Sequence, residues 1–216
     1  MIETNVFHAV LFDMDGTLID STPAVNRSWL RWAVEEGIDP SFRDGMHGRP
    51  ARDIMTSLVL AVKVEEALAR VSHLEMTDTE DITVLPGAVE LVGSIPETRR
   101  AIVTSCSRGL AQVRLAASGF PAPRTVVTID DTLRGKPNPD PFLEAAARLG
   151  VDPRRCIVVE DAPAGLAAAK AAGCATIAVV GTHSAEELDA DLVVSTLDHI
   201  SIEVTDEGLM IRVAHE

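Results

Sequence analysis

Alternation between short apolar runs and helix-patterned segments constrains the fold of this chain more than any other feature. The apolar runs have the length of buried strands and lie at 7–12, 100–104, 125–128, 155–159 and 175–179. The segments with helical periodicity each precede a glycine, a common residue at helix C-termini, and lie at 107–118, 138–149 and 163–172. Strands that alternate with helices of this length favour an α/β fold with a doubly wound parallel sheet.

One segment interrupts this alternation. Residues 23–85 contain no convincing buried strand, and helical patterns cover 25–36, 51–61 and 64–76. We therefore expect a helical domain at 21–82, inserted after the first strand. The α/β core domain would then consist of 1–20 and 83–216.

The C-terminal part of the chain also departs from the pattern. Two short apolar segments, 202–204 and 210–213, flank the turn sequence Asp206-Glu207-Gly208. This spacing predicts a short β-hairpin.

The first polar motif at a strand end is Asp13-Met14-Asp15-Gly16-Thr17-Leu18, directly after the apolar run 7–12. Alternate side chains of an extended segment point the same way, so the carboxylates of Asp13 and Asp15 are expected to converge. Gly16 allows the chain to turn sharply beside them. Converging carboxylates repel one another unless a cation lies between them, and Mg²⁺ prefers such oxygen ligands. A simple turn also explains an isolated Asp-Gly pair.

Three further motifs follow three other predicted strands. Thr104 and Ser105 suit a helix N-cap, and a helix N-terminus with a hydroxyl group beside it can also bind a phosphate. Lys136 lies in a proline-rich loop, which either leaves it solvated or holds its ammonium group in one place. Glu160 and Asp161 precede a helix, where Asp161 suits an N-cap, or they supply a second pair of oxygen ligands. Ligands of open α/β sheets bind beyond the carboxyl ends of the strands, so we expect the four motifs to form one site.

In this order and spacing, the segments DMDGTL, VTS, GKPNPDPF and VVEDAPAG resemble the four signatures of the haloacid dehalogenase superfamily. The similarity covers nearly the whole chain up to about Gly181. The helical insert looks like the type 1 cap of that family, and the core would then be Rossmann-like. Stretches such as HGRP and DTEDITVLPGA are most similar to its cytosolic sugar-phosphate and glycerol-phosphate phosphatases, including the 2-deoxyglucose-6-phosphate type.

The resemblance implies a Mg²⁺-dependent phosphatase that acts on a sugar or polyol phosphate through an aspartyl-phosphate intermediate. Asp13 would attack phosphorus, and Asp15 would protonate the leaving alcohol and then deprotonate water. Mg²⁺ would be held by the Asp13 carboxylate, the Asp15 backbone carbonyl and Asp161, with Glu160 close by or acting through water. The phosphoryl oxygens would be bound by Thr104, Ser105 and Lys136.

The cap is expected to select the substrate. His47, Gly48 and Arg49 lie between two predicted cap helices, in a loop that could reach over the active site. Arg49 is a candidate for binding sugar hydroxyls or a second charged group, and an ordinary surface loop is the alternative. Glu75 and Asn26 are further candidates, although both also suit solvated positions.

A hexose phosphomutase of the β-phosphoglucomutase type is the alternative function, because that group shares the cap and both aspartates. It has a histidine in the linker, five residues after an Asp equivalent to Asp20. This chain has Val25 at the corresponding position. The difference favours a hydrolase over a mutase.

Charge and composition exclude several other classes of protein. The chain has 33 Asp and Glu against 19 Lys and Arg, and the net charge of −14 does not suit nucleic acid or an anionic membrane. No apolar run reaches the ~18 residues of a membrane span, and the first residues lack the basic stretch of a signal peptide. The 3 cysteines without motif spacing indicate a reducing compartment. We expect a cytoplasmic monomer or weak homodimer whose partner is a small phosphorylated metabolite.

Overall fold

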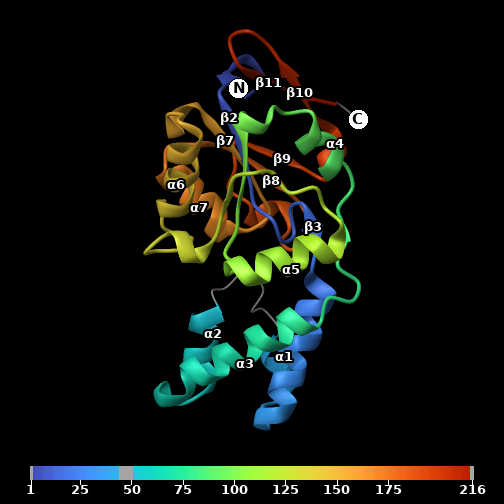
Figure 1. The fold of residues 1–216 in the computed structure, drawn as a ribbon, viewed down its shortest axis with the longest axis vertical. Coiled ribbons are helices and arrows are strands. Elements are labelled where there is room, and N and C mark those ends of the chain that lie inside the picture. The colour runs from blue at the N-terminus through green and yellow to red at the C-terminus, as the bar shows by residue number, and fades with distance from the viewer. Residues whose placement is uncertain (1, 44–50, 215–216) are drawn as a thin grey trace.

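A parallel β-sheet forms the centre of the computed structural model, which describes residues 2–43 and 51–214 (Figure 1). Within these residues the sheet has six strands in the order β6-β5-β2-β7-β8-β9, and neighbouring strands run parallel. The strands are β2 (Ala9–Phe12), β5 (Arg100–Val103), β6 (Val126–Val127), β7 (Cys156–Glu160), β8 (Ala175–Val179) and β9 (Leu192–Val194). The chain winds outward from β2 in both directions, which confirms the doubly wound α/β sheet.

Strand β2 is buried on both faces, which explains its uninterrupted apolar sequence. Because successive side chains point to opposite faces, Val10 and Phe12 join one apolar cluster and Ala9 and Leu11 join another. Helices α4 (Ala88–Gly93) and α5 (Arg108–Ser118) cover the first cluster (Figure 1). Helices α6 (Asp140–Leu149) and α7 (Pro163–Ala171) cover the second.

The central sheet differs from the sequence prediction in two places. The apolar run 7–12 is divided: β1 (Val6–Phe7) pairs with β11, and the sheet strand begins only at Ala9. Between them, His8 donates its backbone N–H to the carbonyl of Arg155 at 2.7 Å. Strand β9 was not predicted, because its residues are only partly buried at the edge of the sheet and form a short run.

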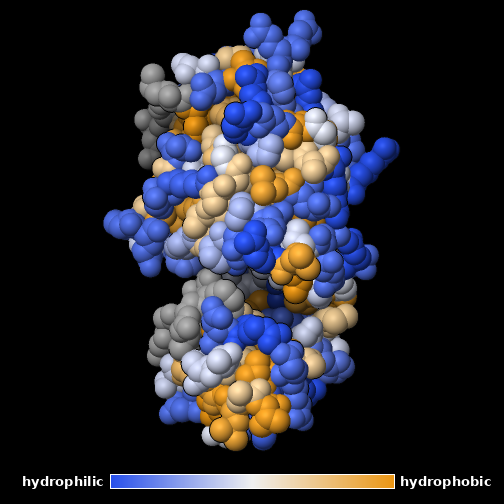
Figure 2. Space-filling view, turned by 90° about the vertical axis from the view of Figure 1, so that its left-hand side faces the viewer, coloured by the Kyte–Doolittle hydropathy of each residue, from blue (hydrophilic) through white to orange (hydrophobic). Residues whose placement is uncertain are grey.

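The inserted helices pack around an apolar cluster of their own. They are α1 (Thr22–Glu36), α2 (Ala51–Leu58) and α3 (Val64–Thr77). Trp29 and Trp32 lie in this cluster with Met55 and Val71, and the two indole rings meet edge to face with centroids 6.0 Å apart. The molecule narrows between these helices, which we call the cap, and the core (Figure 2).

The chain enters and leaves the cap through an antiparallel pair of short strands. These are β3 (Ile19–Asp20) and β4 (Thr83–Val84), with Ile19 opposite Val84. The domain limits expected from the sequence fall beside this pair and stay a prediction.

A small antiparallel sheet lies at the end of the core opposite the cap (Figure 1). Strands β10 (Ile200–Val204) and β11 (Leu209–Val213) form the predicted C-terminal hairpin. Strand β1 pairs with the other side of β11, and Phe7, Leu209 and Ile211 are buried there. Strand β11 therefore pairs with the N-terminal strand β1 as well as with β10.

Candidate active site

Two adjacent strands, β2 and β7, present acidic residues at their carboxyl ends. Phe12 of β2 lies opposite Val159 of β7, and Asp13 continues the pairing by donating its backbone N–H to the Val159 carbonyl at 2.9 Å. This register places Asp13 beside Glu160, the last residue of β7, and beside Asp161, which follows it. The parallel order of the strands thus brings the first and fourth motifs together.

Asp13, Glu160 and Asp161 form an acidic cluster. Within the described residues, each offers a carboxylate oxygen, and these oxygens lie within 4.8 Å of one another. Burial raises the pKa of Asp13 well above its usual range, and the charges of Glu160 and Asp161 add to this effect against the opposing influence of Lys136. Burial and the nearby Glu160 charge raise the pKa of Asp161 to about 7. The cluster therefore resists carrying its full negative charge without a cation.

Lys136 supplies positive charge to this cluster from the loop before α6. Its ammonium group donates to Asp13 Oδ1 at 2.5 Å, to Glu160 Oε1 at 2.8 Å and to the Val103 carbonyl at 3.0 Å. It also lies 5.2 Å from the centre of the Phe142 ring. Burial lowers the pKa of Lys136, but the two carboxylates outweigh burial and raise it above its usual range. The side chain is therefore a fixed, charged group and not a solvated one.

The donor set of the cluster fits a divalent cation. In the part of the chain that the structure describes, the cluster has three buried carboxylates, and the ammonium group of Lys136 contacts only Asp13 and Glu160, which leaves an excess of negative charge. Carboxylate oxygens are ligands that Mg²⁺ prefers.

Hydrogen bonds orient two of these carboxylates. Asp161 accepts from Thr17 Oγ1 at 3.2 Å and from Thr182 Oγ1. Glu160 Oε2 accepts from the backbone N–H groups of Asp161 at 2.8 Å and Ala162 at 2.7 Å. Ala162 is also the N-cap residue of α7, so the interpretation of Asp161 as a helix cap is wrong. The Asp161 carboxylate thus belongs to the cluster.

Two glycines make room for the same carboxylates. A Cβ atom on Gly165 of α7 would overlap the Glu160 carboxylate. A Cβ atom on Gly16 would overlap the Asp161 carboxylate, and Gly16 also has a φ of +88°, in the region that favours glycine. A side chain at either position would therefore displace the carboxylate beside it.

The carboxylate of Asp15 does not join the acidic cluster among the described residues. Its Oδ1 accepts a hydrogen bond from Ser21 Oγ at 2.6 Å and lies 3.0 Å from Arg114 Nη1. Its Oδ2 accepts from Cys106 Sγ at 3.2 Å. Donors from other segments therefore hold the Asp15 carboxylate outside the acidic cluster, and the expected convergence of Asp13 and Asp15 stays a prediction. Burial and the Asp15 charge raise the pKa of the Cys106 thiol, which keeps it a neutral donor.

The end of β5 carries one buried and one exposed hydroxyl group. Thr104 is buried, and its Oγ1 accepts a hydrogen bond from the Cys106 backbone N–H at 3.1 Å, whereas Ser105 is exposed. Helix α5 is capped instead by Ser107, whose side chain accepts from the Leu110 N–H. The N-cap interpretation of Thr104 and Ser105 is therefore wrong, and their role in phosphate binding stays a prediction.

The cap residues expected to select the substrate, His47, Gly48 and Arg49, lie outside the described residues. Glu75 of α3 does lie at the boundary with the core, because its Oε1 is 3.5 Å from Arg114 Nη2. Its side chain is only 13% exposed, so the solvated alternative is wrong.

Arg114 was missed by the sequence reasoning. It lies on the apolar face of α5, next to the buried residues Leu110, Ala111 and Leu115. A charged residue is rarely buried without a partner, so an arginine at a core position of a helix is the signal that points to it.

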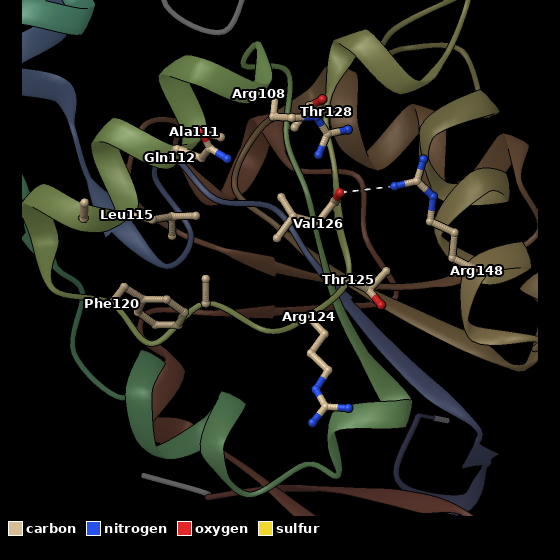
Figure 3. A pocket seen from close by; sticks show the side chains of 12 residues that line it. Arg108, Ala111, Gln112, Leu115, Phe120, Arg124, Thr125, Val126, Thr128 and Arg148 are labelled. Carbon is tan, nitrogen blue, oxygen red and sulfur yellow. Dashed lines mark hydrogen bonds between the residues drawn. The ribbon is translucent and has the colours of Figure 1, made fainter.

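A separate pocket of about 550 Å³ lies at the β6 edge of the sheet (Figure 3). Gln112, Leu115, Phe120 and Arg148 are among its lining residues, and Arg148 donates to the Val126 carbonyl at 3.3 Å. The pocket and the acidic cluster have no residue in common. We therefore place the candidate active site at the cluster.

Comparisons with known proteins show what the chain is similar to. The family described as haloacid dehalogenase-like hydrolase matches residues 7–173. Hexitol phosphatase A of Escherichia coli (strain K12) is 44% identical over 202 residues, which cover 89% of this chain and 92% of that protein. Glycerol-1-phosphate phosphohydrolase 2 of Saccharomyces cerevisiae is 32% identical over 217 residues, which cover 91% of this chain and 84% of that protein.

A solved structure supports the fold as well. The crystal structure of a hydrolase from Pseudomonas syringae matches with a TM-score of 0.78 and 25% identity, over 88% of this chain and 94% of that one. Within residues 2–43 and 51–214, no helix has the length and apolar character needed to cross a membrane.

Proposed function

The chain belongs to the haloacid dehalogenase-like hydrolase family, and on this basis we propose that it is a Mg²⁺-dependent phosphatase of a small sugar or polyol phosphate. The buried cluster of Asp13, Glu160 and Asp161, with Lys136 bound to two of its members, is the observation that carries the proposal. The names of the related hexitol phosphatase and glycerol-1-phosphate phosphohydrolase support a polyol phosphate as the substrate class.

Asp13 is the nucleophile in this proposal. Lys136 binds its Oδ1 and thereby leaves Oδ2 for attack on phosphorus. The new bond joins the carboxylate oxygen to phosphorus, and the bond from phosphorus to the alcohol oxygen breaks. Lys136, together with Thr104 and Ser105 at the end of β5, binds the phosphoryl oxygens as their charge is redistributed.

Asp15 is the acid and base. It gives a proton to the departing alcohol oxygen and then takes one from the water that cleaves the aspartyl-phosphate. Its carboxylate is held by Ser21, Cys106 and Arg114, apart from the acidic cluster, so proton transfer and cation binding use different groups.

The metal site consists of the Asp13 and Asp161 carboxylates and the Asp15 backbone carbonyl, with Glu160 close by or acting through water. A bound divalent cation offsets the repulsion between the carboxylate nucleophile and the phosphate dianion. A cytoplasmic location and a monomeric or weakly dimeric state belong to the same proposal.

Substitution of Asp13 by Asn tests the nucleophile. The variant keeps the shape of the side chain and loses the attacking carboxylate, so phosphate release from a polyol monophosphate should fall about 10⁴-fold or more. A cooperative unfolding transition in the variant shows that the loss of activity does not come from a failure to fold. Asp206→Asn, in the exposed turn between β10 and β11, removes one carboxylate elsewhere and is the matched control. Near wild-type activity in Asp13→Asn would refute the mechanism.

A phosphomutase of the β-phosphoglucomutase type is distinguished by the position of Val25. This residue packs, partly buried, against the apolar cluster of the cap and has no group that transfers protons. Incubation with a hexose 1-phosphate should therefore release inorganic phosphate without forming the 6-phosphate isomer. Accumulation of the isomer faster than phosphate would favour the mutase.

A further inference from the structure

A buried arginine lies between the acid–base residue and the cap. Arg114 is 5% exposed and belongs to α5, the helix of the core that faces the cap in Figure 1. Helix α3 of the cap packs against α5, and the Met76 methyl group would lie 3.5 Å from a Cβ placed on Gly109.

On the core side, Arg114 contacts the group that holds Asp15. Its Nη1 lies 3.0 Å from Asp15 Oδ1 and 3.1 Å from Cys106 Sγ, which itself donates to Asp15 Oδ2. Ser21 Oγ donates to the same Oδ1. Within residues 2–43 and 51–214, the Oδ1 atom thus has two strong donors, whereas the donor to Oδ2 is a thiol. This asymmetry fixes the plane of the carboxylate and leaves Oδ2 the better placed oxygen for exchanging a proton.

On the cap side, the same guanidinium group contacts Glu75. Its Nη2 lies 3.5 Å from Glu75 Oε1, which accepts a hydrogen bond from Trp29 Nε1 at 3.2 Å. Glu75 belongs to α3 and Trp29 to α1, so the contact involves two helices of the cap. One rigid, planar cation is therefore shared between a carboxylate of the core and a carboxylate of the cap.

We infer that Arg114 is a positioning residue that orients the Asp15 carboxylate and ties this orientation to the position of the cap through Glu75. The inference rests on the proposed function, because it assigns Asp15 the proton transfer. A displacement of α3 would remove the Glu75 charge from one face of Arg114 and shift the guanidinium group, and with it Asp15 Oδ1. Proton transfer would then be most efficient only when the cap lies as it does here.

The test compares two esters that differ in their need for a proton. An alcohol leaves slowly without protonation, whereas p-nitrophenolate leaves readily, so a misplaced acid harms hydrolysis of the alkyl ester more. The alkyl substrate is glycerol 1-phosphate or a hexitol phosphate, whichever the wild-type enzyme hydrolyses faster. The readout is the ratio of kcat/KM for the alkyl ester to kcat/KM for p-nitrophenyl phosphate. A purely structural role would lower both values together and leave the ratio unchanged.

Arg114→Met should lower this ratio by about 10-fold or more, and Arg114→Lys should restore part of it. Glu75→Gln keeps the shape of the cap partner and should lower the ratio in the same direction by a smaller factor. Arg108→Met, on the exposed side of the same helix, is the matched control and should leave the ratio unchanged. If Arg114→Met does not fold, the Lys and Gln variants carry the test.

Two failures can be told apart. A wild-type enzyme that hydrolyses neither ester contradicts the proposed function. An active enzyme whose ratio is unchanged in the Arg114 variants, or in Glu75→Gln, overturns the inference about Arg114 and leaves the function intact.

Discussion

In the metal-free protein, the free energy of unfolding should fall as the pH rises from about 4 to 7. Asp161 has an ordinary pKa of 3.8 and a folded-state pKa of about 7. Between these values the folded state keeps a proton that the unfolded chain has released, so the folded state is favoured at low pH and loses this advantage as the pH rises through 7. Through Asp161, each pH unit in this interval lowers the free energy of unfolding by about 1.4 kcal/mol, and the whole interval lowers it by about 4 kcal/mol.

A divalent cation should offset this decline, because it binds the ionised carboxylates. At pH 5.5, protonation of a group with a pKa of about 7 competes with the cation and weakens binding about 30-fold relative to pH 8. At saturating Mg²⁺ this difference corresponds to about 2 kcal/mol less stabilisation at the lower pH.

Urea unfolding of metal-stripped protein, with and without saturating Mg²⁺, measures both effects at pH 5.5 and 8. Asp161→Asn should weaken the pH dependence of the metal-free protein, with the raised pKa of Asp13 keeping part of it, and should lose most of the response to Mg²⁺. Asp206→Asn removes the same charge outside the cluster and should behave as the wild type. Equal stabilisation by Mg²⁺ at the two pH values, or a full response in Asp161→Asn, would refute the reasoning.

Other substitutions probe the packing of the site and of the cap. Gly165→Ala should displace the Glu160 carboxylate and lower kcat about 10-fold or more, and unchanged phosphate release would contradict the close approach. Trp32→Ala should destabilise the cap by about 3–5 kcal/mol, whereas Trp32→Phe should cost less than about 1.5 kcal/mol. The indole Nε1 of Trp32 is buried without a hydrogen-bond partner in the described residues, so the Phe variant loses no hydrogen bond there. Equal losses of unfolding free energy for the Ala and Phe variants, measured in urea, would contradict this expectation. Arg49→Ala should change the relative kcat/KM values over a panel of sugar and polyol phosphates more than the Mg²⁺ requirement, and an unchanged panel would exclude that role.

Local patterns predicted most of the fold because the elements differ in period. Strand β8 and the C-terminal hairpin appear where the apolar runs placed them, since a buried strand needs a short, continuous apolar segment. The pattern failed where burial is partial, as at β9, or where one apolar run serves two sheets, as at β1 and β2. Neither the partial burial of β9 nor the division of one run into β1 and β2 changes the local hydrophobic pattern, so that pattern could not predict them.

The sequence by itself determined that Asp13, Glu160 and Asp161 would meet, because parallel strands present their carboxyl ends at one edge of the sheet. Only the tertiary structure decided that Ser21, Cys106 and Arg114 hold the Asp15 carboxylate. These donors come from Ser21 at the N-cap of α1, from Cys106 in the loop after β5 and from Arg114 in α5, which are far apart in the chain.

The contact between Arg114 and Glu75 has the same origin. The two residues are remote in the chain and are brought together when α3 of the cap packs on α5 of the core. Chain order fixes which residues stand at the ends of strands, but the direction of each side chain follows from partners that only the folded molecule assembles.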